Sequence, residues 1–82
     1  MDNIITNFND VSFFSSKFPG ATSLIVLPFA TAAQNQPTTA SYGFCMVYYG
    51  ANSGVFEQVY FNANGKIFMR NHGADWGAWL EK

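Results

Sequence analysis

Residues whose types suit chemistry are few in this sequence, and they gather toward its C-terminal end. His72 stands three residues before Asp75, and Glu57 is expected near Asn71 across a predicted hairpin. A histidine beside a carboxylate can act as an acid or base, so this end of the hairpin is the place to look for catalysis. The five carboxylates are otherwise scattered, and no catalytic pair is visible. We therefore expect a surface hydrogen bond here and predict that the protein is not an enzyme.

Metal and cofactor chemistry also lack the residues they need. A zinc site requires several His, Cys or carboxylate ligands at short spacing, whereas this chain has 1 His and 1 Cys. Its 7 glycines are dispersed through predicted turns and form no phosphate-binding loop. Cys45, between Phe44 and Met46, is expected to be a buried reduced thiol. We predict no metal and no cofactor.

The remaining chemical feature is aromatic and polar. Trp76 and Trp79 follow closely after Arg70 in the sequence. Between Arg70 and Trp76 lie Asn71, His72 and Asp75. Sugar-binding sites combine aromatic rings, which stack on apolar C–H faces, with amide and carboxylate groups that fix hydroxyls. In a domain this small, however, two tryptophans can equally be the plug that closes an open sheet. Both interpretations stay open at this stage.

Composition limits the class of protein and its partners. The chain has 82 residues, of which 49% are hydrophobic, 18% aromatic and only 11% charged, so it is neither disordered nor a solvated helical bundle. A formal net charge of −1 gives no footprint for nucleic acid or an anionic membrane. The longest strongly apolar stretch, Leu24 to Ala30, contains Pro28 and is too short to span a membrane. We expect no nucleic-acid partner and no membrane insertion.

The pattern of strands and turns predicts one mainly β domain, or an α+β domain with one short N-terminal helix. Asn9 or Asp10 offers an N-cap for a short helix, although a short strand is equally compatible. Ser23 to Phe29 is predicted as a first buried strand, and Thr31 to Ser41 as a surface loop because it has no large apolar side chain. Three strand-like runs then predict an antiparallel meander: Tyr42 to Gly50, Gly54 to Asn62, and Lys66 to Asn71.

The hydrophobic pattern sets the predicted register and core. A three-residue Ala63-Asn64-Gly65 turn with left-handed Gly65 places Phe61 opposite Ile67 and Val59 opposite Met69. Extending this alternation across the preceding GANSG connection predicts one aliphatic core face: Cys45, Val47, Val55, Val59, Phe61, Ile67 and Met69. The opposite face is too aromatic to remain in water, and its predicted members are Phe44, Tyr48, Phe56, Gln58, Tyr60, Phe68 and Arg70. Its cover would be the C-terminal tail, a neighbouring protomer or a ligand.

The C-terminal third resembles a known family. Val59 to Arg70 forms a hairpin that closes on an aromatic-x-Arg strand, and a short polar loop then leads to the W-x-x-W sequence of Trp76 to Leu80. This ending resembles the pyocin-knob type domain of bacteriophage and tailocin tail fibres. Phe8 to Val11 and Leu24 to Leu27 correspond more weakly to that family's start and first core strand. Phe13 to Lys17 lacks the family's Gly-aromatic step.

The resemblance implies a fold and a function. Residues 1–82 would be a single knob-like domain at the C-terminal end of a longer fibre, with a small antiparallel sheet closed by the W-x-x-W segment. Such domains are non-enzymatic, trimeric parts of the virion at the tail-fibre tip, where they contact a bacterial surface glycan or receptor. The expected contacts are Tyr48, Tyr49, Arg70, Asn71, His72, Asp75 and Trp76. The alternative is a structural cap or trimerisation domain that touches no receptor.

Overall fold

A computed structural model of the chain describes residues 4–18, 23–40, 42–50 and 55–82. These residues form a mainly β domain with one mixed sheet of six strands in the order β1-β2-β3-β4-β5-β6. The elements are β1 (Ile5–Asn7), α1 (Val11–Ser15), β2 (Leu24–Gln34), β3 (Gly43–Gly50), β4 (Val55–Asn62), β5 (Ile67–His72) and β6 (Leu80–Glu81). The predicted mainly β class with a short N-terminal helix is confirmed.

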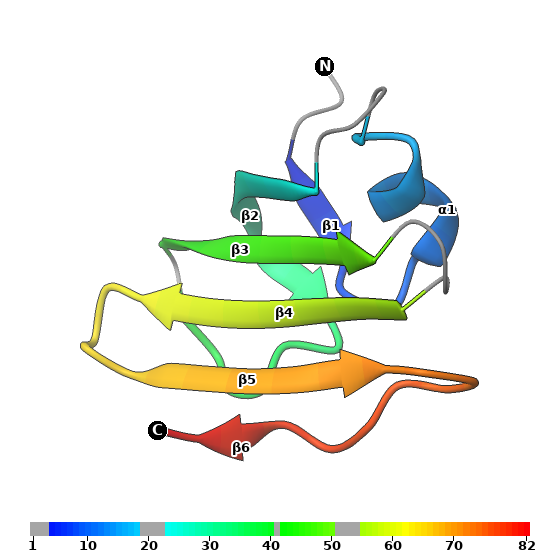
Figure 1. Cartoon of the computed structure of the whole chain (residues 1–82). Coiled ribbons are helices and arrows are strands. Elements are labelled where there is room, and N and C mark those ends of the chain that lie inside the picture. The colour runs from blue at the N-terminus through cyan, green and yellow to red at the C-terminus, as the bar shows by residue number, and fades with distance from the viewer. Residues whose placement is uncertain (1–3, 19–22, 41, 51–54) are drawn as a thin grey trace.

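The long strand β2 links the meander to the N-terminal part of the sheet. Its first half pairs antiparallel with β3, from Leu24 opposite Tyr48 to Pro28 opposite Phe44. Its second half pairs parallel with β1, where Ile5 faces Phe29. In Figure 1, β3 to β6 form the front of the molecule, while the second half of β2 passes behind β3 and β4. The N-terminal part of the chain therefore covers the back of the meander.

The short helix α1 begins where a capping residue permits it. The Asp10 side chain accepts a hydrogen bond from the backbone N–H of Phe13 at 3.1 Å, which satisfies one of the free donors at the helix start. Of the two predicted caps, Asp10 is therefore the one used. The helix buries Phe14, whose ring lies against Trp76 with centroids 6.4 Å apart.

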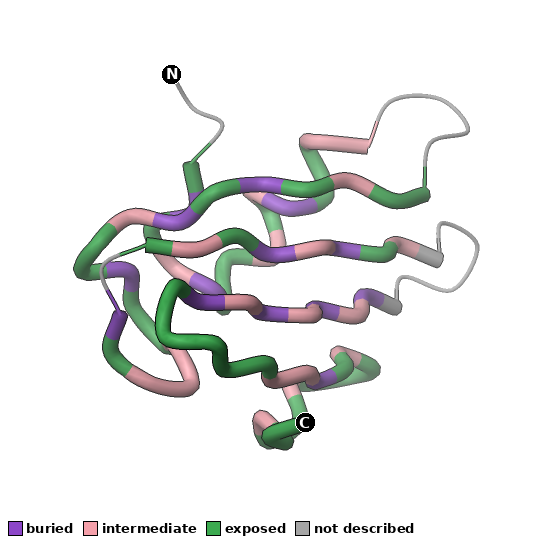
Figure 2. The backbone as a smooth tube through the Cα atoms, turned by 90° about the vertical axis from the view of Figure 1, so that its left-hand side faces the viewer, coloured by how far each residue is buried: buried purple, intermediate pink, exposed green. Residues whose placement is uncertain are grey.

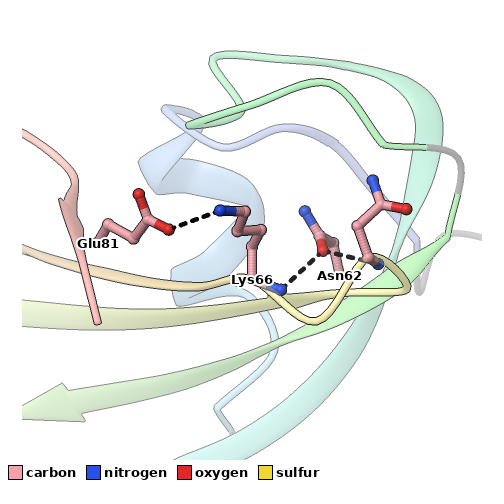
Figure 3. Close-up of polar contacts among 4 residues, drawn as sticks. Asn62, Lys66 and Glu81 are labelled. Atoms are coloured by element: carbon pink, nitrogen blue, oxygen red, sulfur yellow. Dashed lines mark hydrogen bonds and ion pairs between the residues drawn. The ribbon is translucent and has the colours of Figure 1, made fainter.

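The turn between β4 and β5 has the predicted form. Gly65 adopts φ 81°, and Phe61 lies opposite Ile67 as expected. The Asn62 side-chain oxygen accepts hydrogen bonds from the backbone N–H groups of Asn64 and Lys66 (Figure 3). The Lys66 ammonium also pairs with Glu81 of β6 at 3.1 Å, in the exposed ion pair drawn in Figure 3. The turn thus fixes the register of β4 against β5.

The predicted core face is wrong across the connection between β3 and β4. Tyr49 pairs with Phe56 and Gly50 with Val55, so the connection has four residues rather than the five of GANSG. This one-residue difference moves every β4 and β5 side chain to the opposite face relative to β3. Residues 51–54 and the Val55 side chain lie outside the described residues.

The sheet therefore has two faces of different membership. The inner face, which packs under the N-terminal segments, consists of Cys45, Val47, Tyr49, Phe56, Gln58, Tyr60, Phe68, Arg70 and His72. The outer face consists of Phe44, Met46, Tyr48, Glu57, Val59, Phe61, Ile67, Met69 and Asn71. Val59, Phe61, Ile67 and Met69, predicted as core, thus stand on the outer face. Buried and more exposed residues alternate along the strands in Figure 2, as expected for a sheet with one covered face.

Aromatic rings fill the space between the inner face and the N-terminal cover. The Phe8 ring lies edge-on to Phe29 and Tyr60 at 5.6 Å and to Trp79 at 5.8 Å between centroids. Phe29 and Tyr60 stack at 4.9 Å. Such pairs add to the stability that burial of their area provides. The β4 and β5 members of the predicted aromatic face therefore form the core, and their cover comes from the chain itself. Phe44 and Tyr48, predicted on the same face, lie on the outer face instead and are exposed.

The segment from Thr31 to Ser41 is not simply a surface loop. Its first residues, as far as Gln34, continue β2, and Ala33 and Ala40 are buried. The Tyr60 hydroxyl lies 2.9 Å from Gln36 Oε1 and 3.2 Å from the backbone oxygen of Thr38. Polar contacts and small buried side chains thus hold this segment, although it lacks a large apolar residue; Ser41 lies outside the described residues.

The predicted strand from Ser23 to Phe29 is present as part of β2 but only one of its sides is buried. Leu27 and Phe29 point into the core, whereas Leu24 is 53% and Val26 57% exposed. The sequence predicted a buried strand here, and the structure limits that burial to one side. In the structure, the described segments that pack on the sheet do so from the inner side.

Candidate functional site

Arg70 is the buried cation at the centre of the inner face. Its Nε donates to Gln58 Oε1 at 2.8 Å, and its terminal nitrogen donates to the backbone oxygen of Phe8 at 2.7 Å and to Asn9 Oδ1 at 2.8 Å. Gln58 in turn donates to the same Phe8 oxygen at 2.9 Å. The guanidinium therefore joins β4, β5 and the turn before α1 through charge-assisted hydrogen bonds.

The two tryptophans stack on this guanidinium. Its central carbon lies 4.2 Å from the ring centroid of Trp76 and 4.3 Å from that of Trp79, both within cation–π range. The Trp76 indole N–H donates to the backbone oxygen of Asn9 at 3.2 Å, and that of Trp79 donates to the backbone oxygen of Asn35 at 3.1 Å. Both rings thus act as the plug that closes the sheet.

Burial changes the acid–base properties of two groups in this core. Desolvation lowers the pKa of Arg70 to about 10, still far above neutral, so the guanidinium stays charged. Desolvation likewise raises the pKa of the Cys45 thiol to about 12, and Cys45 is fully buried. A protonated, enclosed thiol is a poor nucleophile.

A different set of residues forms an accessible polar row on the outer face. Tyr48 pairs with Glu57 across β3 and β4, and Glu57 pairs with Asn71 across β4 and β5. Because directly paired residues project to the same side of a sheet, a phenol, a carboxylate and a carboxamide stand next to one another. Tyr48 is 45% exposed and Asn71 is also exposed. This row, defined here as the polar row, has the groups that hold sugar hydroxyls and a ring face.

The other predicted contacts lie around the same end of the sheet but are divided between its faces. Tyr49 points inward and stacks on Phe56 with centroids 4.7 Å apart. His72 is half-buried beside Trp76, with ring centroids 4.7 Å apart, and its Nδ1 has no hydrogen-bond partner among the described residues. Asp75 is exposed in the following loop, and no described hydrogen bond joins its side chain to His72.

The seven predicted contacts therefore separate into three groups. Arg70 and Trp76 belong to the closing plug. Tyr49 packs on Phe56 and His72 packs on Trp76, both on the inner side. Tyr48, Asn71 and Asp75 are accessible. Sequence reasoning left Glu57 out of the site, although the predicted pairing with Asn71 was the signal that could have included it. Asn9 and Gln58, which bind Arg70, were also missed; a buried arginine requires such acceptors.

Residues 4–18, 23–40, 42–50 and 55–82 contain no group of three or more His, Cys, Asp and Glu residues placed to hold a metal ion. In the same ranges, the chain forms no helix with the length and apolar character needed to cross a membrane.

Comparison with known proteins gave no match: no protein-family model, no curated protein and no solved structure is significantly similar to this chain. The resemblance to the pyocin-knob type domain therefore rests on the residues quoted for it.

Proposed function

We propose that this protein is a non-enzymatic domain of a bacteriophage tail fibre that attaches to a bacterial surface glycan. In this proposal it acts as a homotrimer at the tip of the fibre in the virion. Repetition of one weak site in linked copies would raise the overall avidity by about 10² to 10⁴ without new contacts.

The polar row carries the proposal. A tyrosine ring that is 45% exposed stands beside Glu57 and Asn71, on strands whose register is fixed by continuous pairing. Rigid strands suit a recognition site because the side chains need little ordering when the ligand arrives. Asp75, exposed in the loop after β5, adds a second carboxylate at this end of the sheet.

The test is binding of the labelled protein to a panel of bacterial cells and to the polysaccharides extracted from them. The test variant is Tyr48→Ala with Asn71→Ala, which removes the ring and the amide of the polar row. The matched control is Tyr42→Ala with Asn64→Ala, which removes the same two residue types at exposed positions outside the row; Tyr42 is 72% exposed.

The proposal expects saturable binding to one surface type, competition by its polysaccharide, and loss of binding in the test variant only. Circular dichroism must show that both variants fold. Absence of binding to every surface in the panel, or equal binding by the two variants, contradicts the proposed attachment site.

A structural cap or trimerisation domain without a receptor is the second candidate, and the position of Trp76 favours it. This residue stacks on Arg70 and donates to Asn9, so its ring is part of the fold. Trp76→Ala should lower the free energy of unfolding by about 3 to 5 kcal/mol, as for a large packed aromatic. An unfolding curve that hardly moves would count against this candidate.

A further inference from the structure

The outer face carries an apolar surface that the described part of the chain leaves uncovered. Strand pairing arranges it in two rows parallel to the polar row. The middle row is Val26, Met46, Val59, Met69 and Leu80, and the last row is Pro28, Phe44, Phe61 and Ile67. We define these two rows as the apolar rows. The side chains of α1, β1 and the W-x-x-W segment that pack on the sheet belong to the core cluster of the inner face.

The exposed area of these rows is large for so small a domain. The exposed large apolar side chains of the two rows are Val26 57%, Phe44 42%, Ile67 36% and Leu80 59%. Leu24, which pairs with Tyr48 and adjoins the rows, is 53% exposed. At roughly 150 Å² or somewhat more for a whole large side chain, the two rows and Leu24 together expose about 600 Å². The largest apolar patch of a typical monomer is about 300 to 600 Å², whereas one side of a standard protein interface is about 800 Å². With the adjoining polar row as a rim, the outer face has the size of an interface.

We propose that the apolar rows are buried against another copy of this chain. The described outer face has one charged residue in its paired strands, Glu57, and that residue lies in the polar row at the rim. Two such faces can pack at the usual distance of about 10 Å between sheets without burying a carboxylate. The polar row then stays in water beside the contact. This inference does not depend on the proposed attachment to a glycan.

An identical copy suits this surface better than a charged partner. A nucleic acid or an anionic membrane would need a basic surface, and the rows contain no Lys or Arg. A second copy presents the same uncharged rows and needs no charge complement. Its binding would follow from apolar burial, as in homo-oligomers whose interfaces resemble a divided core.

The experiment measures the mass of the whole protein by analytical ultracentrifugation over a concentration series. The test variant is Val26→Lys with Leu80→Lys, which places an ammonium group at each end of the middle row. Both positions are more than half exposed in a single copy, so the fold should tolerate lysine there. The matched control, Ala63→Lys with Ala74→Lys, adds the same charge at exposed positions outside the strands.

We expect the unmodified protein and the control to associate, and the test variant to associate at least about a hundredfold more weakly, because lysines would lose their water at the contact. Ile67→Gln, a single neutral change in the last row, should weaken association in the same direction. Near-ultraviolet circular dichroism at low concentration must show that each variant retains the packed core.

A dimer and a trimer both support the proposed interface, but only a trimer also agrees with the proposed function. A trimer agrees with both proposals, whereas a stable dimer supports the interface and contradicts the trimeric fibre domain. A monomer at every concentration, or equal association of the unmodified protein and the test variant, overturns the interface.

Discussion

Replacement of Arg70 tests the account of how the sheet is closed. In Arg70→Met, the methionine side chain fills the space of the apolar part of arginine. Gln58 Oε1, however, loses the Arg70 Nε donor that lies 2.8 Å away. The Phe8 oxygen keeps its bond from Gln58, and Asn9 is exposed and can bind water. A stranded buried acceptor costs about 1 to 3 kcal/mol, and each lost cation–π contact costs about 1 kcal/mol. Because methionine also removes the desolvation cost of a buried charge, we expect a net loss of about 3 kcal/mol in the free energy of unfolding.

The decisive comparison is with Arg70→Lys. Lysine keeps the charge but cannot supply a planar group that stacks between two indoles and donates from several nitrogens. It should therefore destabilise the domain at least as much as methionine does. Urea unfolding followed by circular dichroism should show midpoints lowered by about 2 to 3 M, since small proteins have slopes near 1 kcal/mol per M.

The control for these variants is Lys66→Met, which removes a cation from an exposed ion pair and should cost less than about 1 kcal/mol. The concentration dependence of each midpoint shows whether association contributes. If Arg70→Lys unfolds close to the unmodified protein, a point charge suffices and the role given to the stacked guanidinium is refuted.

Three further predictions concern pH and two glycines. Because the folded-state pKa of Cys45 is raised from 9.0 to about 12, the thiol contributes stability that is complete below pH 9 and is lost as the pH rises toward 12. Relative to Cys45→Ala, the unmodified protein should lose about 1.4 kcal/mol between pH 8 and pH 10, and a constant difference would contradict this burial. Gly43→Ala should destabilise by about 2 kcal/mol, because its Cβ would meet the Phe61 backbone oxygen and lie 2.7 Å from the Phe29 ring, whereas Gly73→Ala meets nothing within 4 Å and serves as its control. Gly65→Ala should cost about 1 kcal/mol in unfolding experiments, since φ is 81°, and Gly65→Asn should cost less because asparagine tolerates left-handed backbone; equal costs would argue against a left-handed turn.

The predictable part of the fold is that in which local chemistry decides the outcome. The start of α1 could be narrowed to two caps, Asn9 or Asp10, because a capping side chain serves the N–H groups that follow it; the structure uses Asp10. The β4–β5 register followed from the positive φ of Gly65 together with the alternation on either side. Both features depend on residues close together in the sequence.

The part that could not be predicted depends on the length of one connection. Apolar residues occupy both faces of the meander, so hydrophobic alternation did not distinguish a four-residue from a five-residue connection between β3 and β4. The deciding contacts are distant in sequence, because Arg70 and Gln58 can be buried only where Phe8 and Asn9 supply acceptors. The same inversion explains the divided site: Trp76 and Arg70 followed the core, while Tyr48 and Asn71 remained accessible.

The closing plug has a consequence for the order in which the domain folds. Arg70 and Trp76 bind Asn9 across sequence separations of 61 and 67 residues. Until residue 79 has been synthesised, a growing chain cannot complete this closure, and the aromatic inner face lacks its cover. Contacts this distant also slow folding, because the loop must close before they form. Nascent chains would therefore expose aromatic surface until residue 79 has been synthesised, and a chaperone would be most useful during this interval.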